Sequence, residues 1–261
     1  MEYLVISITA LFAAALALFS GFGLGTLLTP AFVFFFPVQV AIAATAIVHL
    51  VNNFFRIFLV GRFADWKVVL RFGLPAVLAA VLGAWLLGRL TWMPAMAVYQ
   101  LGGRLHEITP VKLVIGVVII LFALLDLIPR LRKLNFNPKY LPVGGLFSGF
   151  FGGLSGNQGA LRSAFLIKTG VNPKSFIGTN SICVVGVDII RLVVYGASFY
   201  ATNFALIDRE IWIVVVTAVV SAGIGSLIGF RLIKRVTINT VRYIVGAMLM
   251  IVGAGLTGGL L

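Results

Sequence analysis

The stretch Gly152-Gly-Leu-Ser-Gly-Asn-Gln-Gly-Ala-Leu-Arg-Ser-Ala-Phe165 decides how the rest of the chain is interpreted. It places glycines, side-chain amides and Arg162 inside a chain that is otherwise as apolar as a membrane. In hydrocarbon, irregular backbone and a guanidinium are tolerated only where protein or a water-filled cavity surrounds them. The stretch is therefore the first candidate for a binding site. The alternative is a glycine-rich contact between helices, with Arg162 reaching toward the membrane interface.

The composition tells us in which solvent the chain folds. Of 261 residues, 61% are hydrophobic and 10% are charged, whereas soluble domains carry about 25% charged residues. The mean hydropathy is +1.13. The apolar segments are near-continuous runs without the alternation of outer-membrane strands, so we expect an all-α membrane protein in a lipid bilayer.

The basic residues indicate how the chain is oriented in the membrane. A net charge of +13 could indicate a nucleic-acid partner, but the lysines and arginines form short clusters between apolar segments. That is the positive-inside pattern, and we expect no nucleic-acid partner. A single cysteine, Cys183, excludes an internal disulfide and a multi-cysteine metal site, and no metal or cofactor is expected. The N-terminus lacks the basic region of a cleavable signal, so the first helix should be retained.

Residues 3–36 are too long for one crossing. A straight helix of that length would be about 50 Å, compared with a hydrocarbon core of about 30 Å. Gly21, Gly23 and Gly25 supply the backbone freedom for a break. We therefore expect two half-helices that meet near the middle of the membrane, the alternative being one long helix kinked at these glycines.

Three further helices are expected before the middle of the chain. The first, over residues 39–60, places His49, Asn52, Asn53 and Arg56 on one broad face, which should look inward. The next runs from the basic turn at residues 62–71 to about Gly88, and the last covers residues 111–128. The connection over residues 89–109 is interpreted as an interfacial loop.

The second half of the chain repeats the first. Similar residues recur in the same order at nearly constant offsets, as in the pairs Gly25 and Gly159, Arg56 and Arg191, Gly83 and Gly225, and Lys112 and Arg242. Duplicated halves are typical of secondary transporters. We expect residues 1–130 to form the first half, 131–139 a basic cytoplasmic linker and 140–261 the second half, all within one membrane domain.

The charges predict how the halves lie. If residues 140–169 form a re-entrant hairpin, the basic clusters at residues 56–71, 130–139 and 231–242 all fall on the cytoplasmic side, and residues 192–208 lie outside. The prediction is two inverted repeats, each made of a glycine-rich re-entrant or broken-helix hairpin and three transmembrane helices. Arg89, Arg104 and Lys112 fall outside in this arrangement and count against it.

Inverted hairpins would bring their tips together at mid-membrane. A half-helix that starts there presents free N–H groups and the positive end of its dipole, which suits an anion. The tips contain no carboxylate, which argues against a metal cation. We therefore expect a small oxyanion or organic acid as substrate. The expected substrate-binding residues are Gly23, Gly25, Thr26, Asn52, Asn157, Gln158, Gly159, Arg162, Ser163, Thr179 and Asn180.

At these residues the chain resembles a known family. The glycine-rich hairpin, the later Gly178-Thr-Asn180 and Asp188, and the partner stretch Gly21-Phe-Gly-Leu-Gly-Thr-Leu-Leu-Thr-Pro30 are similar to the TauE/SafE family of sulfite exporters and sulfonate permeases. The resemblance implies an inner-membrane exporter of sulfite, sulfoacetate or other organosulfur anions. The chain departs from the family pattern at Asn157-Gln158, Ser163-Ala164 and Asn180, which lie at the proposed site.

Four residues are candidates for coupling or gating: His49, Arg56, Asp188 and Arg191. Asp188 and Arg191 are three positions apart on one helix and can form an ion pair. Either this pair is purely structural, or Asp188 takes up a proton during the access change and couples transport to a proton gradient. His49 is interpreted as a hydrogen-bonded packing residue rather than a proton carrier. Thr179 and Asn180 either cap their helix or reach the substrate.

The functional prediction is a secondary transporter of small anions that works by alternating access. An anion channel would need the same dipoles, and a membrane-embedded enzyme is the alternative from another class. No catalytic motif is recognisable, so no enzyme activity is expected. Glycines at positions 246, 253, 255 and 258 are compatible with packing inside one subunit or with a homodimer.

Overall fold

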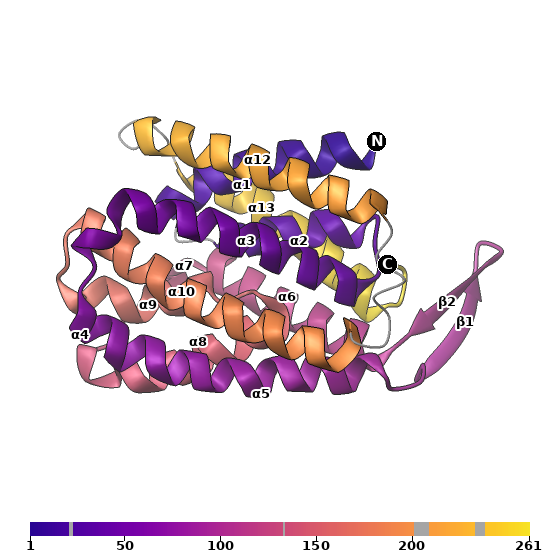
Figure 1. Ribbon diagram of the computed structural model, residues 1–261. Helices are drawn as coiled ribbons and strands as arrows, with labels where there is room; N and C mark the ends of the chain where they lie inside the picture. The colour runs from indigo at the N-terminus through magenta and orange to yellow at the C-terminus, as the bar shows by residue number, and fades with distance from the viewer. Residues whose placement is uncertain (21–22, 133, 201–208, 233–237) are drawn as a thin grey trace.

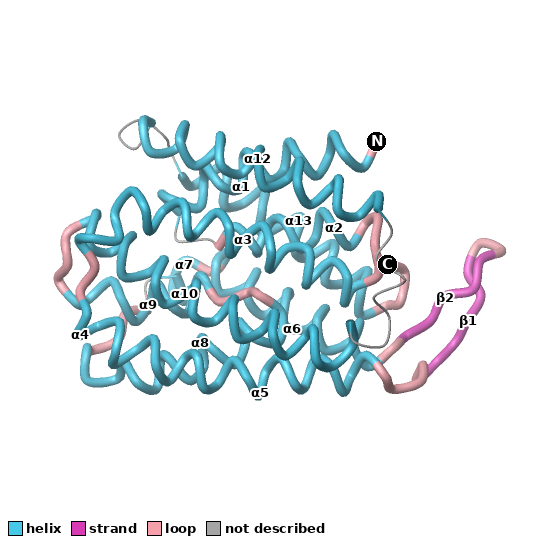
Figure 2. Tube along the Cα trace, in the orientation of Figure 1, coloured by secondary structure: helices cyan, strands magenta, loops and turns pink. Residues whose placement is uncertain are grey.

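A computed structural model describes residues 1–20, 23–132, 134–200, 209–232 and 238–261. The first half contains α1 (Glu2–Ser20), α2 (Leu24–Val33), α3 (Val38–Val60), α4 (Trp66–Val68), α5 (Leu74–Thr91), β1 (Ala97–Leu101), β2 (Arg104–Ile108) and α6 (Pro110–Leu127). The second contains α7 (Pro129–Arg132), α8 (Leu141–Ser155), α9 (Gly159–Leu166), α10 (Pro173–Tyr195), α12 (Arg209–Leu232) and α13 (Ile238–Thr257). Most of the helices lie side by side along one direction (Figures 1 and 2).

Five helical segments among the described residues are long and apolar enough to cross a membrane: Val38–Phe63, Trp66–Thr91, Pro110–Leu127, Pro173–Ser198 and Arg209–Arg231. The second of these joins α4 to α5 through a π-helical turn over Val69–Gly73. Large apolar side chains such as Phe58, Leu78 and Val220 are exposed on the outside of the array. An apolar outer surface of this kind suits a lipid environment, so the chain is an all-α membrane protein apart from one β-hairpin.

The first helical break lies where the glycines predict it. α1 ends at Ser20 and α2 begins at Leu24, after Gly23 in an extended conformation (φ −73°, ψ 147°). Residues 21–22, including Gly21, lie outside the described residues. All ten residues of α2 are buried. The long apolar segment is therefore two packed helices rather than one kinked helix.

The second break turns the chain back on itself. α8 ends at Gly156, whose φ of +78° is the left-handed conformation that glycine adopts most easily. The N–H of Phe136, before α8, donates to the carbonyl of Ala164 in α9 at 3.1 Å, and the rings of Phe136 and Phe165 stack with centroids 4.3 Å apart. The start of α8 and the end of α9 therefore lie together, as in a hairpin.

Each hairpin packs on a helix of the other half. α8 lies along α5, and α1 lies along α12. The α8 contact is formed by glycines four residues apart: a Cβ on Gly145, Gly149 or Gly153 would overlap the carbonyl oxygens of Phe72, Ala76 and Ala80, respectively. Such small-residue spacing lets two helix backbones approach closely in a membrane. A glycine-rich contact between helices, the alternative given above for the stretch over residues 152–165, therefore explains the glycines of α8.

The remaining helices pair between halves as well. α3 packs against α10, and α6 against α13. A Cβ on Gly178, near the start of α10, would lie 2.6 Å from the carbonyl oxygen of Val60 at the end of α3, so these two helices run antiparallel. Gly246 and Gly253 contact Leu127 and Ile120 of α6, so these two glycines serve packing within one chain.

The connection over residues 89–109, expected as an interfacial loop, contains a β-hairpin instead. β1 and β2 pair antiparallel, with Leu101 opposite Arg104, and the turn uses Gly102 (φ 58°) and Gly103 (φ 78°). Two consecutive residues with positive φ form the hairpin turn that matches strand twist. The Tyr99 hydroxyl donates to the carbonyl of Gly258, which ties the hairpin to the end of α13. The hairpin extends beyond the helices (Figure 1).

Candidate functional site

The tips of the two broken helices touch. A Cβ on Gly25 would lie 3.2 Å from the carbonyl oxygen of Gly156, and a Cβ on Gly23 would lie 4.0 Å from the Cα of Gly159. Both α2 and α9 therefore begin at the same place, from opposite halves of the chain. The first N–H groups of a helix have no partner within the helix, so each start offers backbone donors. The structure thus brings together the two stretches that the sequence predicts as tips.

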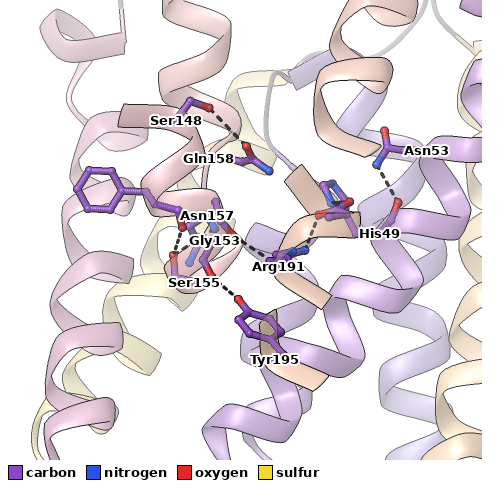
Figure 3. A network of polar contacts seen from close by, with 12 residues as sticks. His49, Asn53, Ser148, Gly153, Ser155, Asn157, Gln158, Arg191 and Tyr195 are labelled. Carbon is purple, nitrogen blue, oxygen red and sulfur yellow. Dashed lines mark hydrogen bonds and ion pairs between the residues drawn. The ribbon is translucent and has the colours of Figure 1, made fainter. Parts of the chain in front are cut away.

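Three polar side chains are buried at the second tip. Asn157, Gln158 and Arg162 are only 1%, 2% and 4% exposed. The Oε1 atom of Gln158 accepts from the Ser148 hydroxyl at 3.4 Å (Figure 3). Nε of Arg162 donates to Oδ1 of Asn180. Asn180 therefore reaches the tip, as one of its two expected roles requires.

Several donors at this tip have no hydrogen-bond partner among the described residues. They are Nη1 of Arg162, Nε2 of Gln158 and Nδ2 of Asn157, and one acceptor, Oδ1 of Asn157, also has no partner there. A buried donor left unpaired costs about 1–3 kcal/mol, and more when it is charged. Native structures rarely retain such groups without a ligand or ordered water to satisfy them. The tip is therefore arranged to donate hydrogen bonds to something that accepts them.

A charged network lies beside the second tip. Oδ2 of Asp188 lies 2.9 Å from Nδ1 of His49, and Oδ1 of Asp188 lies 2.8 Å from Nη2 of Arg191. Asp188 and Arg191 are fully buried, and His49 is nearly so. The predicted pairing of Asp188 with Arg191 is therefore present, and His49 joins it from α3 of the other half (Figure 3).

The network also holds the end of α8. Nη1 of Arg191 donates to the carbonyl of Gly152 at 3.3 Å, and the Tyr195 hydroxyl donates to the carbonyl of Gly153. A Cβ on Gly156 would lie 2.5 Å from Nη1 of Arg191. α10 thus fixes the turn that leads into the tip. No sequence pattern indicates a role for Tyr195, because its partner is a main-chain carbonyl.

Arg56 forms a second buried polar group near the first hairpin. Its Nη2 atom donates to the carbonyl of Ala14 in α1 at 3.1 Å. The Asn52 amide satisfies both of its neighbours when its oxygen accepts from Arg56 at 3.3 Å and its nitrogen donates to Ser226 at 2.7 Å. Asn53 donates to the carbonyl of His49 at 2.8 Å. Arg56 thus braces α1 as Arg191 braces α8, from the corresponding position of the other half.

Thr179 lies elsewhere than at the tip. Its hydroxyl accepts from the N–H of Asp65 at 2.8 Å, and so it fixes the connection between α3 and α4. Thr26 is buried in the first turn of α2, and Ser163 is half-buried on α9. No three His, Cys, Asp or Glu side chains gather as a metal site would need, within the part of the chain that the structure describes.

One known protein family matches nearly the whole chain. Residues 6–256 match the family described as Sulfite exporter TauE/SafE. The chain belongs to this family. TauE/SafE proteins are membrane transporters rather than enzymes, and the apolar helices agree with a multi-pass membrane protein. Neither a curated protein nor a solved structure matches the chain.

Proposed function

We propose that the protein is a secondary transporter that exports a small anion, sulfite or an organosulfonate in the first instance. The observation that carries the proposal is the meeting of two helix starts, one from each half, around buried donors that lack partners. Helix starts and fixed cations favour negative charge. The substrate-binding set is Gly23, Gly25, Thr26, Asn157, Gln158, Gly159, Arg162 and Asn180, with Asn52 and Ser163 at its edge.

Transport would proceed by alternating access between two inverted repeats. The proposal divides the chain into residues 1–130, a linker over 131–139 and residues 140–261. The reciprocal packing of α8 on α5 and of α1 on α12 supports the division, since a two-fold axis in the membrane plane would relate these contacts. The antiparallel course of α3 and α10 agrees with it. Rocking of one half against the other would open the tip site to each side in turn.

The orientation follows from the basic residues. The end of α3, α4 and the end of α12 lie at one end of the array, and the two termini and the β-hairpin lie at the other (Figure 1). Arg62, Lys67 and Arg231 therefore gather at the first end, which we assign to the cytoplasm of a cell with this protein in its inner membrane. Lys234 and Arg235 of the third basic cluster lie outside the described residues.

Proton coupling is proposed at the charged network. Asp188 joins α3 to α10, and through Arg191 it reaches the end of α8. Protonation of Asp188 would weaken its contacts with His49 and Arg191 and so loosen the second tip. Intramembrane carboxylates in this position commonly carry protons in transporters.

The test is anion binding to the purified protein, measured as a rise in melting temperature. The panel contains sulfite, sulfate, thiosulfate, sulfoacetate, taurine, acetate and phosphate, because a ligand that binds only the folded state stabilises it. We expect a sulfur oxyanion to stabilise the protein, Arg162→Ala to abolish the effect, and Lys168→Ala, an exposed cation just beyond α9, to retain it. An Arg162→Ala variant that responds like the parent would contradict the site.

Flux measurements distinguish a transporter from a channel. In proteoliposomes, a transporter gives saturable flux and counterflow of labelled anion, whereas a channel gives neither counterflow nor saturation at moderate concentration. Counterflow that is lost in Arg162→Ala would support alternating access around the same site.

A further inference from the structure

The buried charges of the described residues do not balance. The buried cations are Arg56, Arg162 and Arg191, and Asp188 is the single buried carboxylate. Both oxygens of Asp188 are already engaged, one by His49 and the other by Arg191. Arg56 and Arg162 therefore remain without a carboxylate partner in the part of the chain that the structure describes.

Among the described residues, both arginines donate to neutral acceptors. Arg162 donates to the amide oxygen of Asn180, and Arg56 donates to the carbonyl of Ala14. The two arginines come from opposite halves of the chain. Across the antiparallel contact of α3 with α10, Gly178 lies against Val60 and Asp188 against His49, so Arg56 lies at nearly the same level as Asn180, the partner of Arg162. A buried charge whose counter-charge is missing is strongly unfavourable in a low-dielectric interior. Two uncompensated positive charges near one another call for an anion to offset both.

We propose that the anion at the tip site carries two negative charges and is held between Arg162 and Arg56. This inference rests on the proposed function and adds the charge of the substrate to it. Arg162 supplies the direct contact through its unpaired Nη1, together with Nε2 of Gln158. Arg56 acts through its charge from the first half. A singly charged anion would leave one of the two arginines uncompensated.

The arrangement selects by charge more than by shape. The donors at the tip are amide and guanidinium groups on side chains that can turn to meet differently shaped oxyanions. The two positive charges, by contrast, are held by a part-buried hydrogen bond to Asn180 and a buried one to Ala14. Interactions with charge are strong in a dry interior. Anions of similar size should therefore be distinguished chiefly by their charge.

The experiment compares sulfate with methanesulfonate. The two are similar tetrahedral anions, but a methyl group replaces one oxygen in methanesulfonate and its charge is one unit smaller. Dissociation constants are measured by calorimetry on the purified full-length protein in a low-chloride buffer. We expect the wild type to bind sulfate at least about tenfold more tightly than methanesulfonate.

Substitutions at Arg56 test the source of the preference. Arg56→Gln removes one uncompensated charge and should bring the sulfate-to-methanesulfonate ratio close to one. Arg56→Lys keeps the charge and should keep the ratio, even if both affinities fall. Arg62→Gln makes the same change at an exposed arginine six residues further on and should leave both affinities unchanged.

The outcomes separate the two proposals. A wild-type ratio of one or less, with binding that still needs Arg162, overturns the double charge and leaves the anion transporter standing. Absence of binding by every anion overturns both. An unchanged ratio in Arg56→Gln overturns the role of Arg56. If Arg56→Gln does not fold, the test relies on the wild-type sulfate-to-methanesulfonate ratio and on Arg56→Lys. Retention of the ratio in Arg56→Lys supports the proposal, and its loss counts against the proposal.

Discussion

Asp188 has two partners in the membrane interior, the imidazole of His49 and the guanidinium of Arg191. Its oxygens lie 2.9 Å from Nδ1 of His49 and 2.8 Å from Nη2 of Arg191. Breaking a buried ion pair on one side is more harmful than removing both partners, because it leaves an uncompensated charge. The stability of the network should therefore depend on which atoms are removed together.

Asp188→Asn should lower the free energy of unfolding by about 3–5 kcal/mol, since it leaves Arg191 buried without a counter-charge. The double variant Asp188→Asn with Arg191→Gln should lose less than the single variant. Thermal unfolding of the purified protein in detergent would measure both changes. Glu210→Gln, at an exposed carboxylate in the first turn of α12, is the control and should unfold like the parent. Equal stability of Asp188→Asn and wild type would show that the pair does not stabilise the fold.

Only contacts between nearby positions could be predicted at the scale of single residues. The pairing of Asp188 with Arg191 follows from their spacing of three on one helix. The contact of His49 with Asp188 joins different halves of the chain, and no local sequence pattern predicts it. The contact of Arg56 with α1 could not be predicted either, because its partner is the main-chain carbonyl of Ala14, and its expected role in gating stays a prediction.

At the scale of helices, the contact between α5 and α8 brings two helix backbones from different halves close together. A Cβ on Gly149 would overlap the carbonyl, C and Cα atoms of Ala76, which are backbone atoms and cannot turn aside. A Cβ on Gly223 of α12, by contrast, would have no other atom within 4 Å. The two glycines therefore respond differently to one substitution.

Gly149→Ala should destabilise the protein by about 1–3 kcal/mol or more, because the two helices must separate. Gly223→Ala, the matched control, should be neutral or stabilising by up to about 1 kcal/mol through helix propensity. Melting temperatures of the two variants, compared in one detergent, give the answer. The account of the contact fails if Gly149→Ala melts at or above the temperature of Gly223→Ala.

The helical breaks were predictable because length and glycine content both demanded them. Residues 3–36 exceed one crossing, and the glycines mark the place of the turn. The β-hairpin was missed, although Gly102-Gly103 between β-forming residues is itself a hairpin signal. Its strands are short, and their charged and aromatic residues are also typical of an interfacial loop.

At the scale of the whole molecule, the prediction concerns which ends of the helices face the cytoplasm. Cys183 is buried and is the only cysteine in the sequence, so introduced cysteines can be labelled against a low background. Gln100→Cys in β1 should react with a membrane-impermeant maleimide in intact cells. Lys67→Cys and Lys139→Cys should react only after the membrane is opened. Lys168→Cys, at an exposed position just beyond α9, should label from the same side as Lys139→Cys. Labelling of Lys139→Cys and Lys168→Cys from opposite sides would rule out the re-entrant second hairpin.

The exchange of hairpins between halves has a consequence for biosynthesis. α1 is the first helix to be synthesised, yet α12, on which it packs, begins only at Arg209. At ordinary translation rates of about 5–20 residues per second, α1 waits for about 10–40 s in the bilayer without this partner. Its apolar sequence allows it to wait in lipid. Asp188 and Arg191 face no such delay, since His49 and α8 are already in place when α10 is inserted.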